Sequence, residues 1–142
     1  MEVRLLYLSL RMKIESEVAR AMTKFYRDLL GKGPEETKVY IIDDLVLVRL
    51  RGTLTREEQQ LARTQRGCQL IKEIREELRE LNLGEEERII SKITGYEVLN
   101  SQGNISTITG EAILVFIMEQ NIGKIFSGKS CGKDMTISRH PV

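Results

Sequence analysis

The chain has 142 residues, a formal net charge of +1, 30% charged residues and 41% hydrophobic residues. A chain of this length can bury a sizeable core as one domain, without a metal or a disulfide. The nearly neutral charge argues against a nucleic-acid-binding protein, because such proteins carry a marked basic excess. The longest apolar run, from Ala112 to Met118, is far shorter than the ~20 residues that a membrane-spanning helix needs.

The two cysteines, Cys68 and Cys131, stand apart in the sequence and have no metal-ligand spacing. Reduced thiols are therefore expected, as in the cytosol. The apolar residues near the start are few, lie between Arg4 and Arg11, and lack a small-residue cleavage site, so no secretory signal is expected. Together these features predict a soluble cytoplasmic protein without a cofactor.

An amphipathic helix is the first clear element. Gly31 and Gly33-Pro34 end it, since glycine favours a left-handed cap and proline cannot continue the helix. Residues 1–11 either extend this helix or form a separate strand. The apolar residues that recur at spacings of three and four are Ile14, Val18, Ala21, Met22, Phe25, Tyr26, Leu29 and Leu30.

A β-hairpin follows, with strands over residues 38–42 and 45–51 joined by Asp43-Asp44. Aspartate tolerates the positive φ of a two-residue turn. This turn sets the register, with Ile42 opposite Leu45. One face of the hairpin is then wholly apolar and belongs to the core, while the other is too apolar to remain in water. We expect a helix or another subunit to cover that second face, which holds Tyr40, Ile42, Leu45 and Leu47.

Two or three helices are expected next. Thr55 and Glu58 have the spacing of a capping box, which predicts a short helix through Ala62. A longer helix carries an apolar stripe from Leu70 to Leu81, and Leu83-Gly84 is expected to break it. Glu85-Glu86-Glu87 then favours the start of a third helical segment, because acidic residues stabilise a helix N-terminus.

The last part of the predicted domain is a second antiparallel unit, in one sheet with the hairpin. It consists of strands over 96–100 and 105–108, a turn over 101–103 between them, and a final strand over 111–118. Both faces of this final strand are apolar, so it is expected inside the sheet and covered on both sides. The fold class is therefore α+β, with one domain over residues 1–118.

Residues 119–142 are rich in Gly, Ser and Lys and show no periodicity, so they are expected to form a mobile tail that is dispensable for folding. Gly123 to Ser130 matches the P-loop pattern by letter. Only twelve residues follow it, which leaves no room for the helix that completes such a site. The only histidine, His140, lies in the same tail and is not expected to form a catalytic triad.

One cluster of polar residues is a candidate for contact with a small anion or a partner. Guanidinium groups beside hydroxyl groups suit phosphate or bicarbonate. The alternative is that these arginines are solvated or structural, since charged sheet edges are common. The cluster consists of Arg49, Arg51, Arg63, Thr64, Arg66, Ser106 and Thr107, with Thr109 nearby.

Several segments, in the same order and spacing over about residues 12–118, carry a family resemblance. They are Gly31–Pro34, Val39–Gly52, Leu61–Thr64 with Gly67, Ile93–Gly95, Asn104–Glu111 and Val115-Phe116. Together they resemble a bacterial family named as component C of a Na⁺-translocating membrane-potential-generating system (MpsC-like). The chain departs from the family at Asn104, where the resemblance leads us to expect an acid. The resemblance implies a link to cation transport or inorganic-carbon uptake, and it carries over no catalytic residue.

These features favour a non-enzymatic accessory or regulatory protein, peripheral to a membrane ion or inorganic-carbon transport system. A homodimer is expected, because three helices are too few to cover both faces of the sheet and two-fold symmetry is the commonest. A small-anion or metabolite-binding module is the second hypothesis. An enzyme whose site forms at a subunit interface is the third.

Overall fold

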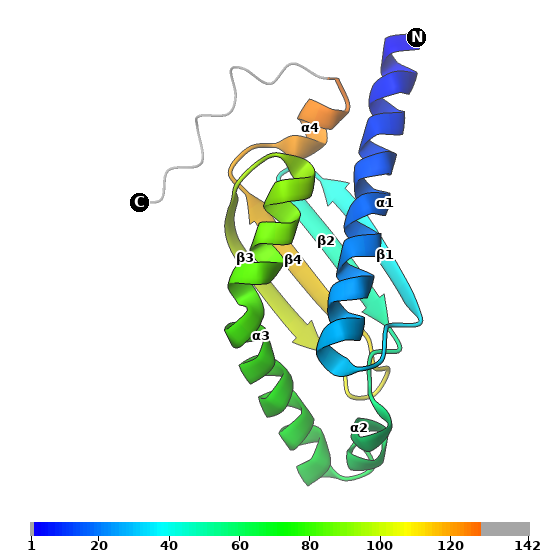
Figure 1. Cartoon of the computed structure of the whole chain (residues 1–142), viewed down its shortest axis with the longest axis vertical. Coiled ribbons are helices and arrows are strands. Elements are labelled where there is room, and N and C mark those ends of the chain that lie inside the picture. The colour runs from blue at the N-terminus through cyan, green and yellow to red at the C-terminus, as the bar shows by residue number, and fades with distance from the viewer. Residues whose placement is uncertain (1, 129–142) are drawn as a thin grey trace.

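The computed structural model describes residues 2–128 and has two layers. One is a four-stranded antiparallel sheet with the strand order β1-β2-β4-β3, and the other consists of helices on one face of it (Figure 1). This arrangement confirms the α+β class. The elements are α1 (Glu2–Leu30), β1 (Glu36–Ile42), β2 (Leu45–Arg51), α2 (Arg56–Leu61), α3 (Gln65–Thr94), β3 (Val98–Ile105), β4 (Ala112–Met118) and α4 (Ile122–Phe126).

Helix α1 starts at Glu2, so the first residues extend the helix and do not form a strand. Its predicted apolar stripe packs on the sheet, with Val18 and Met22 fully buried. The N-terminal turns extend beyond the sheet (Figure 1), where Leu6 and Leu10 are exposed.

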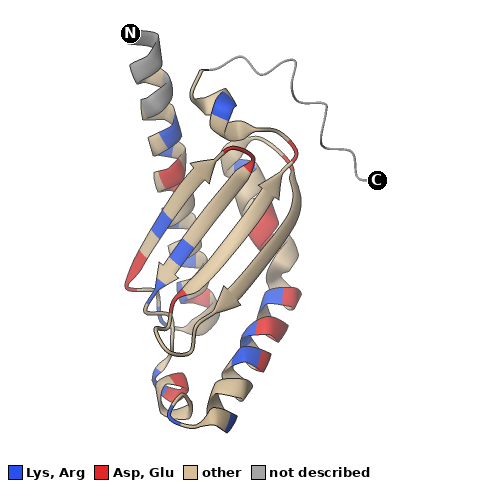
Figure 2. Ribbon diagram, turned by 180° about the vertical axis from the view of Figure 1, so that it is seen from behind, with Lys and Arg blue, Asp and Glu red and all other residues tan. Residues whose placement is uncertain are grey.

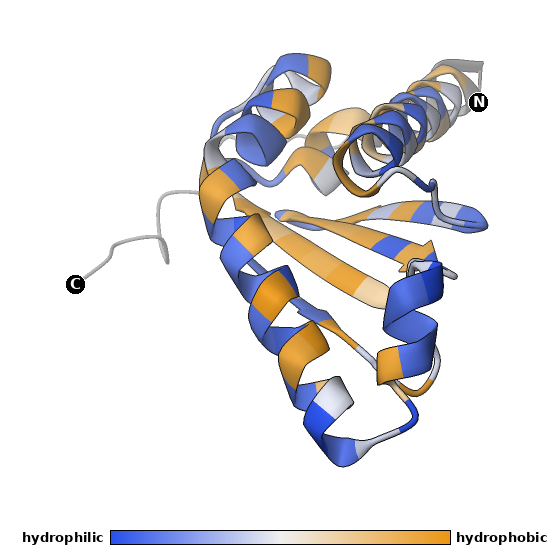
Figure 3. Cartoon of the chain, turned by 60° about the horizontal axis from the view of Figure 1, so that its bottom comes forward, coloured by the Kyte–Doolittle hydropathy of each residue, from blue (hydrophilic) through white to orange (hydrophobic). Residues whose placement is uncertain are grey.

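The β1–β2 hairpin has the predicted register, with Ile42 opposite Leu45 and Val39 opposite Val48. Asp43 adopts a φ of 55°, as a two-residue turn requires. The expected inner face is in the core: Val46, Val48 and the other apolar residues of that face are buried. The strands in the middle of the sheet are hydrophobic along most of their length (Figure 3).

The second antiparallel unit is simpler than expected. Strand β3 continues through residues 101–103, where Gly103 lies opposite Leu114 in the ladder. The turn lies instead at Ser106 to Gly110, closed by a 2.8 Å hydrogen bond from the Gly110 N–H to the Ser106 carbonyl. The prediction of two short strands with a turn between them was therefore wrong. Gly103 is not part of a turn. Because it has no side chain, it allows α3 to approach β3 closely.

Helix α3 runs unbroken over 30 residues, so the predicted break at Leu83-Gly84 and the separate third helix were wrong. Gly84 is exposed and touches nothing that opposes a helical path. A mid-helix glycine costs only about 1 kcal/mol. Ile71, which precedes Gly84 in the helix, and Ile90, which follows it, are both fully buried, and their burial outweighs that cost.

The chain does not become a tail at residue 119. Residues 122–126 form α4, whose Ile122 and Phe126 are buried in the core. The N–H of Gly123 donates to the Asp43 carbonyl at 2.7 Å, and a Cβ at Gly123 would come within 2.5 Å of the Asp43 backbone nitrogen. The expected domain limit at 118 is therefore too early. The described part of the P-loop-like segment forms α4, while Lys129, Ser130, Cys131 and His140 lie outside the described residues.

Replacing Phe126 by alanine tests whether α4 belongs to the core. A buried phenylalanine that is truncated to alanine costs about 3–5 kcal/mol. We therefore expect Phe126→Ala to lower the free energy of unfolding by this amount in a urea titration followed by circular dichroism. The matched control is Ile108→Ala, since Ile108 is 93% exposed and its truncation should cost less than about 0.5 kcal/mol. Equal midpoints for the two variants would contradict the placement of α4.

Candidate functional site

The sheet face opposite the helices is the first candidate site. When the sheet is viewed from this side, α1 and α3 lie behind it, and α2 and α4 lie at its two ends (Figure 2). Cross-strand pairing sets its apolar side chains in rows, such as Tyr40, Leu47 and Val115. No described residue covers the face, which we call the outer apolar face. It consists of Tyr40, Ile42, Leu45, Leu47, Ile113, Val115 and Ile117, all exposed or half-buried.

The end of this face away from the Asp43-Asp44 turn is charged, and it contains two of the predicted site residues. The Arg49 Nε donates to the Glu111 carboxylate at 2.8 Å. Arg51 lies 3.3 Å from Glu36 and 3.8 Å from the same Glu111 carboxylate. The hydrogen bond to Glu111 raises the pKa of Arg49. Both arginines therefore pair with carboxylates, which favours the structural interpretation of this cluster.

The other predicted site residues have local structural roles or lie exposed. The Thr64 hydroxyl caps α3 by accepting from the Gly67 N–H at 2.8 Å, while Arg63 and Arg66 are exposed at the α2–α3 corner. The Ser106 hydroxyl accepts from the backbone of the β3–β4 turn, which also contains Thr107. Among the described residues, no hydrogen bond or ion pair joins these groups to Arg49 or Arg51. Anion binding by the seven residues stays a prediction, and these contacts do not favour it.

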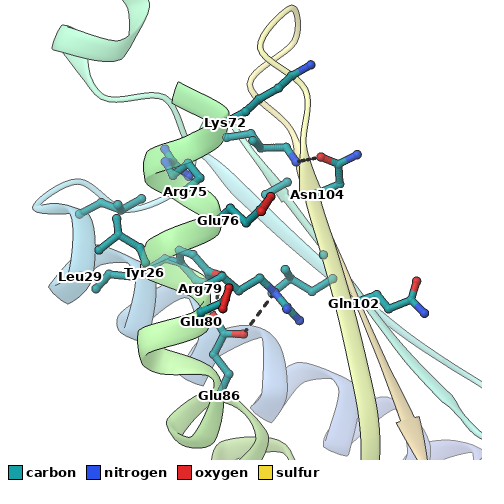
Figure 4. Close-up of a pocket in the computed structure, with 16 residues that line it drawn as sticks. Tyr26, Leu29, Lys72, Arg75, Glu76, Arg79, Glu80, Glu86, Gln102 and Asn104 are labelled. Carbon is teal, nitrogen blue, oxygen red and sulfur yellow. Dashed lines mark hydrogen bonds and ion pairs between the residues drawn. The ribbon is translucent and has the colours of Figure 1, made fainter. Parts of the chain in front are cut away.

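A second candidate site lies on the helix side of the sheet. It is a cavity of about 390 Å³ between α1, α3 and the inner face of β3 and β4 (Figure 4). Its apolar walls include Leu29, Leu30, Leu78 and Leu114.

Glu86 lies at this cavity and is fully buried. The Tyr26 hydroxyl donates to its Oε2 at 2.8 Å, whereas its Oε1 accepts no hydrogen bond. Burial raises the pKa of the Glu86 carboxyl, since it outweighs the hydrogen bond from Tyr26 and the attraction of Arg79. Burial also raises the pKa of the Tyr26 hydroxyl, and the neighbouring Glu86 raises it further.

Two arginines of α3 line the cavity and differ in their bonding. Arg75 donates to both carboxylate oxygens of Glu58, at 2.8 and 2.7 Å, and to the Thr53 carbonyl at 2.6 Å. Arg79 lies beside Glu86, but its Nε is 3.9 Å from Oε1, which is an ion pair without a hydrogen bond (Figure 4). The Nε and Nη2 of Arg79 are both buried and have no acceptor. The cavity thus contains a guanidinium with unused donors.

The sequence analysis missed this group, because it assigned Glu86 to the start of a separate third helix. Continuing one helical phase through Gly84 would have found it. Ile71, Arg75, Arg79, Glu86 and Ile90 recur at the spacing of one helix face. The described residues contain no cluster of three or more His, Cys, Asp or Glu side chains that could hold a metal ion.

Comparison with known proteins identifies the family of this chain. The family model described as Na⁺-translocating membrane potential-generating system (MpsC) matches residues 10–120, so the chain belongs to this family. The uncharacterized protein YbcI of Bacillus subtilis (strain 168) is 36% identical over 116 residues, which cover 79% of this chain and 94% of YbcI. The uncharacterized protein YrhF of the same organism is 25% identical over 100 residues, 70% of this chain and 82% of YrhF. No solved structure matches the chain.

The Glu58–Arg75 pair predicts a pH-dependent stability. Burial alone would raise the pKa of Glu58, but hydrogen bonds from Arg75 and Thr55 together outweigh burial and lower it. A lowered pKa means that the pair stabilises the fold above the unfolded-state pKa, and that this contribution is lost as the pH falls through the folded-state pKa. We expect Glu58→Gln to cost about 3–5 kcal/mol at pH 7.

Urea titrations of Glu58→Gln and wild type over a pH series will measure this contribution. The difference between the two proteins should shrink as the pH falls below the ordinary glutamate range. The matched control is Glu57→Gln, because Glu57 is the exposed neighbour in the same helical turn. A stability difference that stays constant with pH would show that the charge of Glu58 is not what holds Arg75.

Proposed function

We propose that this chain is a non-enzymatic accessory component of a membrane system that generates a membrane potential through Na⁺ translocation or handles inorganic carbon. The family description supports the link to such a system. No helix among residues 2–128 is long and apolar enough to cross a membrane. In this proposal the protein lies on the cytoplasmic side and acts as a peripheral subunit.

The outer apolar face is the observation that supports action by protein contact. Ile42 at the end of edge strand β1 is 50% exposed, and Ile113 of central strand β4 is 40% exposed, in a sheet whose other side is covered by helices. Contiguous apolar patches with polar rims are typical of protein interaction sites. On one flank β3 supplies such a rim with Asn100, Gln102 and Asn104.

We assign this face to a second copy of the same chain, because its turn end is acidic and its other end has a small excess of basic side chains. Asp43, Asp44 and Glu119 lie at the turn end. At the other end, three basic side chains lie with two acidic ones, Glu36 and Glu111. A two-fold axis across the strands brings the turn end of one copy onto the basic end of its partner, so that both ends find complementary charge. The three basic residues are Lys38, Arg49 and Arg51.

A charge at the centre of the outer apolar face tests this assignment. Leu47 lies between Tyr40 and Val115 in the middle row. We expect wild type to be a dimer in light scattering at micromolar concentration, and Leu47→Glu to be a monomer with unchanged helical circular dichroism. A buried interface does not accept an unpaired carboxylate, whereas an exposed face of a monomer does.

Leu81→Glu is the control, since Leu81 is a 74% exposed leucine of α3, and it should remain dimeric. A monomeric wild type would overturn the assignment to a second copy. If wild type is monomeric and Leu47→Glu also loses a co-purifying membrane subunit that Leu81→Glu retains, the face belongs to that subunit instead.

A further inference from the structure

We propose that the cavity between α1, α3 and the sheet binds a small carboxylate with a short apolar tail. The carboxylate contacts Arg79, and the tail lies along the leucines of the cavity wall. This site is on the helix side of the sheet, so it is separate from the outer apolar face and does not depend on the function proposed for that face.

The unused donors of Arg79 are the first argument. Its Nε and Nη2 are buried and lack acceptors, and the fork of an arginine guanidinium binds a carboxylate through two parallel hydrogen bonds. A buried donor without an acceptor is destabilising, and more so when it is charged. A ligand carboxylate would supply two acceptors to this edge of the guanidinium.

Among residues 2–128, no carboxylate accepts a hydrogen bond from the Nε or Nη2 of Arg79. The Glu86 Oε1 is 3.9 Å from its Nε, which is beyond hydrogen-bond distance. Glu58, which forms bonds at 2.7 and 2.8 Å to Arg75, is already occupied. The same helix thus has one arginine with a complete set of acceptors and one without, at the wall of the same cavity.

The surroundings hold the Arg79 side chain closely against β3. Both unpaired nitrogens are covered by neighbouring groups, so binding requires the guanidinium to turn toward the cavity. Its neighbour on β3 is Gly103, and a Cβ there would come within 2.5 Å of the Arg79 Nε. The absence of a side chain at this position is what lets the arginine lie against the strand.

The charge of the inner groups favours an anion over a cation. The Arg79 guanidinium has only hydrogen-bond donors and no acceptor, while burial raises the pKa of the Glu86 carboxyl and thereby favours its neutral form. Tyr26 already donates to Glu86 and adds no negative charge, because its own pKa is raised. The exposed acids Glu76 and Glu80 and the exposed base Lys72 also line the cavity.

The shape and lining of the cavity favour a short apolar tail. Its volume of about 390 Å³ is within the range of small-molecule sites. Four leucines line it, together with Ile105 and Ala112 of the sheet. An apolar chain that leaves water against these walls gains roughly 25 cal/mol for each Å² it buries.

Calorimetric titration with octanoate tests the proposal on the full chain. Octylamine and octanol serve as probes of the same tail length with a cationic and a neutral head group. We expect octanoate to bind with a one-to-one stoichiometry and the other two probes to bind at least tenfold more weakly. Preferred binding of octylamine would overturn the proposal, since it would assign the head-group site to the acids. No binding by octanoate would overturn it too, because Arg79 and Glu86 would then be a structural pair only.

Substitution of Arg79 locates the binding site. Arg79→Met keeps an apolar stem of similar length, and it should weaken octanoate binding about tenfold to a hundredfold, as expected for the loss of charge-assisted hydrogen bonds. The control is Arg88→Met, which removes an exposed arginine of the same helix whose side chain is 71% exposed, and it should bind octanoate like wild type.

A double variant keeps the test valid if Arg79→Met alone folds poorly. Arg79→Met with Glu86→Gln removes both the guanidinium and the carboxyl group and leaves Tyr26 a hydrogen-bonding partner. Folding is checked by circular dichroism before titration. Octanoate affinity that is unchanged in the folded double variant would show that the probe binds elsewhere, for example on the outer apolar face, and would overturn the proposal.

Discussion

The structure depends on one constraint: both long helices, α1 and α3, lie on the same side of a four-stranded sheet. The inner face is then sealed, with Val46, Val48 and Phe116 fully buried. The outer face of β1, β2 and β4 is also apolar over its middle rows, and no helix among residues 2–128 covers it. A sheet buried on both faces has strands that are continuous hydrophobic runs, and β4 is such a run. The sequence of β4 is therefore fitted to an environment that residues 2–128 of one chain do not provide.

Local patterns in the sequence predicted the parts of the fold that local physics decides. The Asp43-Asp44 turn and its register, the capping box at Thr55 and the inner apolar face of the hairpin are all confirmed. Each rests on residues within a few positions of one another. The family resemblance is confirmed as well.

The errors occurred where a distant contact overrode a local signal. Gly84 and Gly103 were interpreted as breaks, but one is tolerated in a helix packed on both sides and the other lies beneath Arg79. The Gly123 segment was taken for a tail, although it packs against the Asp43 turn, eighty positions earlier in the chain. The buried pair of Tyr26 and Glu86 is sixty residues apart. No pattern within a short window contains these distances.

The arginines of the chain differ in whether a carboxylate lies within hydrogen-bond distance of the guanidinium. Arg49 and Arg75 each have a carboxylate within 2.8 Å and act as structural ties. Arg79 has its carboxylate neighbour more than an ångström further away. Sequence alone places all three in strand or helix but gives no information on which of them is satisfied. The distances therefore favour the cavity, and not the charged end of the outer apolar face, as the candidate ligand site.

The strand order also has a consequence for how the chain folds. The β1–β2 and β3–β4 hairpins each form from neighbouring residues, so they can close early. The β2–β4 pairing joins Leu45 to Ile117 and closes a loop of more than seventy residues. Because closing so long a loop loses more chain entropy, this pairing is expected to form after the hairpins. During synthesis, β2 is complete long before β4 leaves the ribosome, and its free edge is then a template for wrong pairing. Arg49 and Arg51 lie on β2, and their charges disfavour its pairing with other chains before β4 is available.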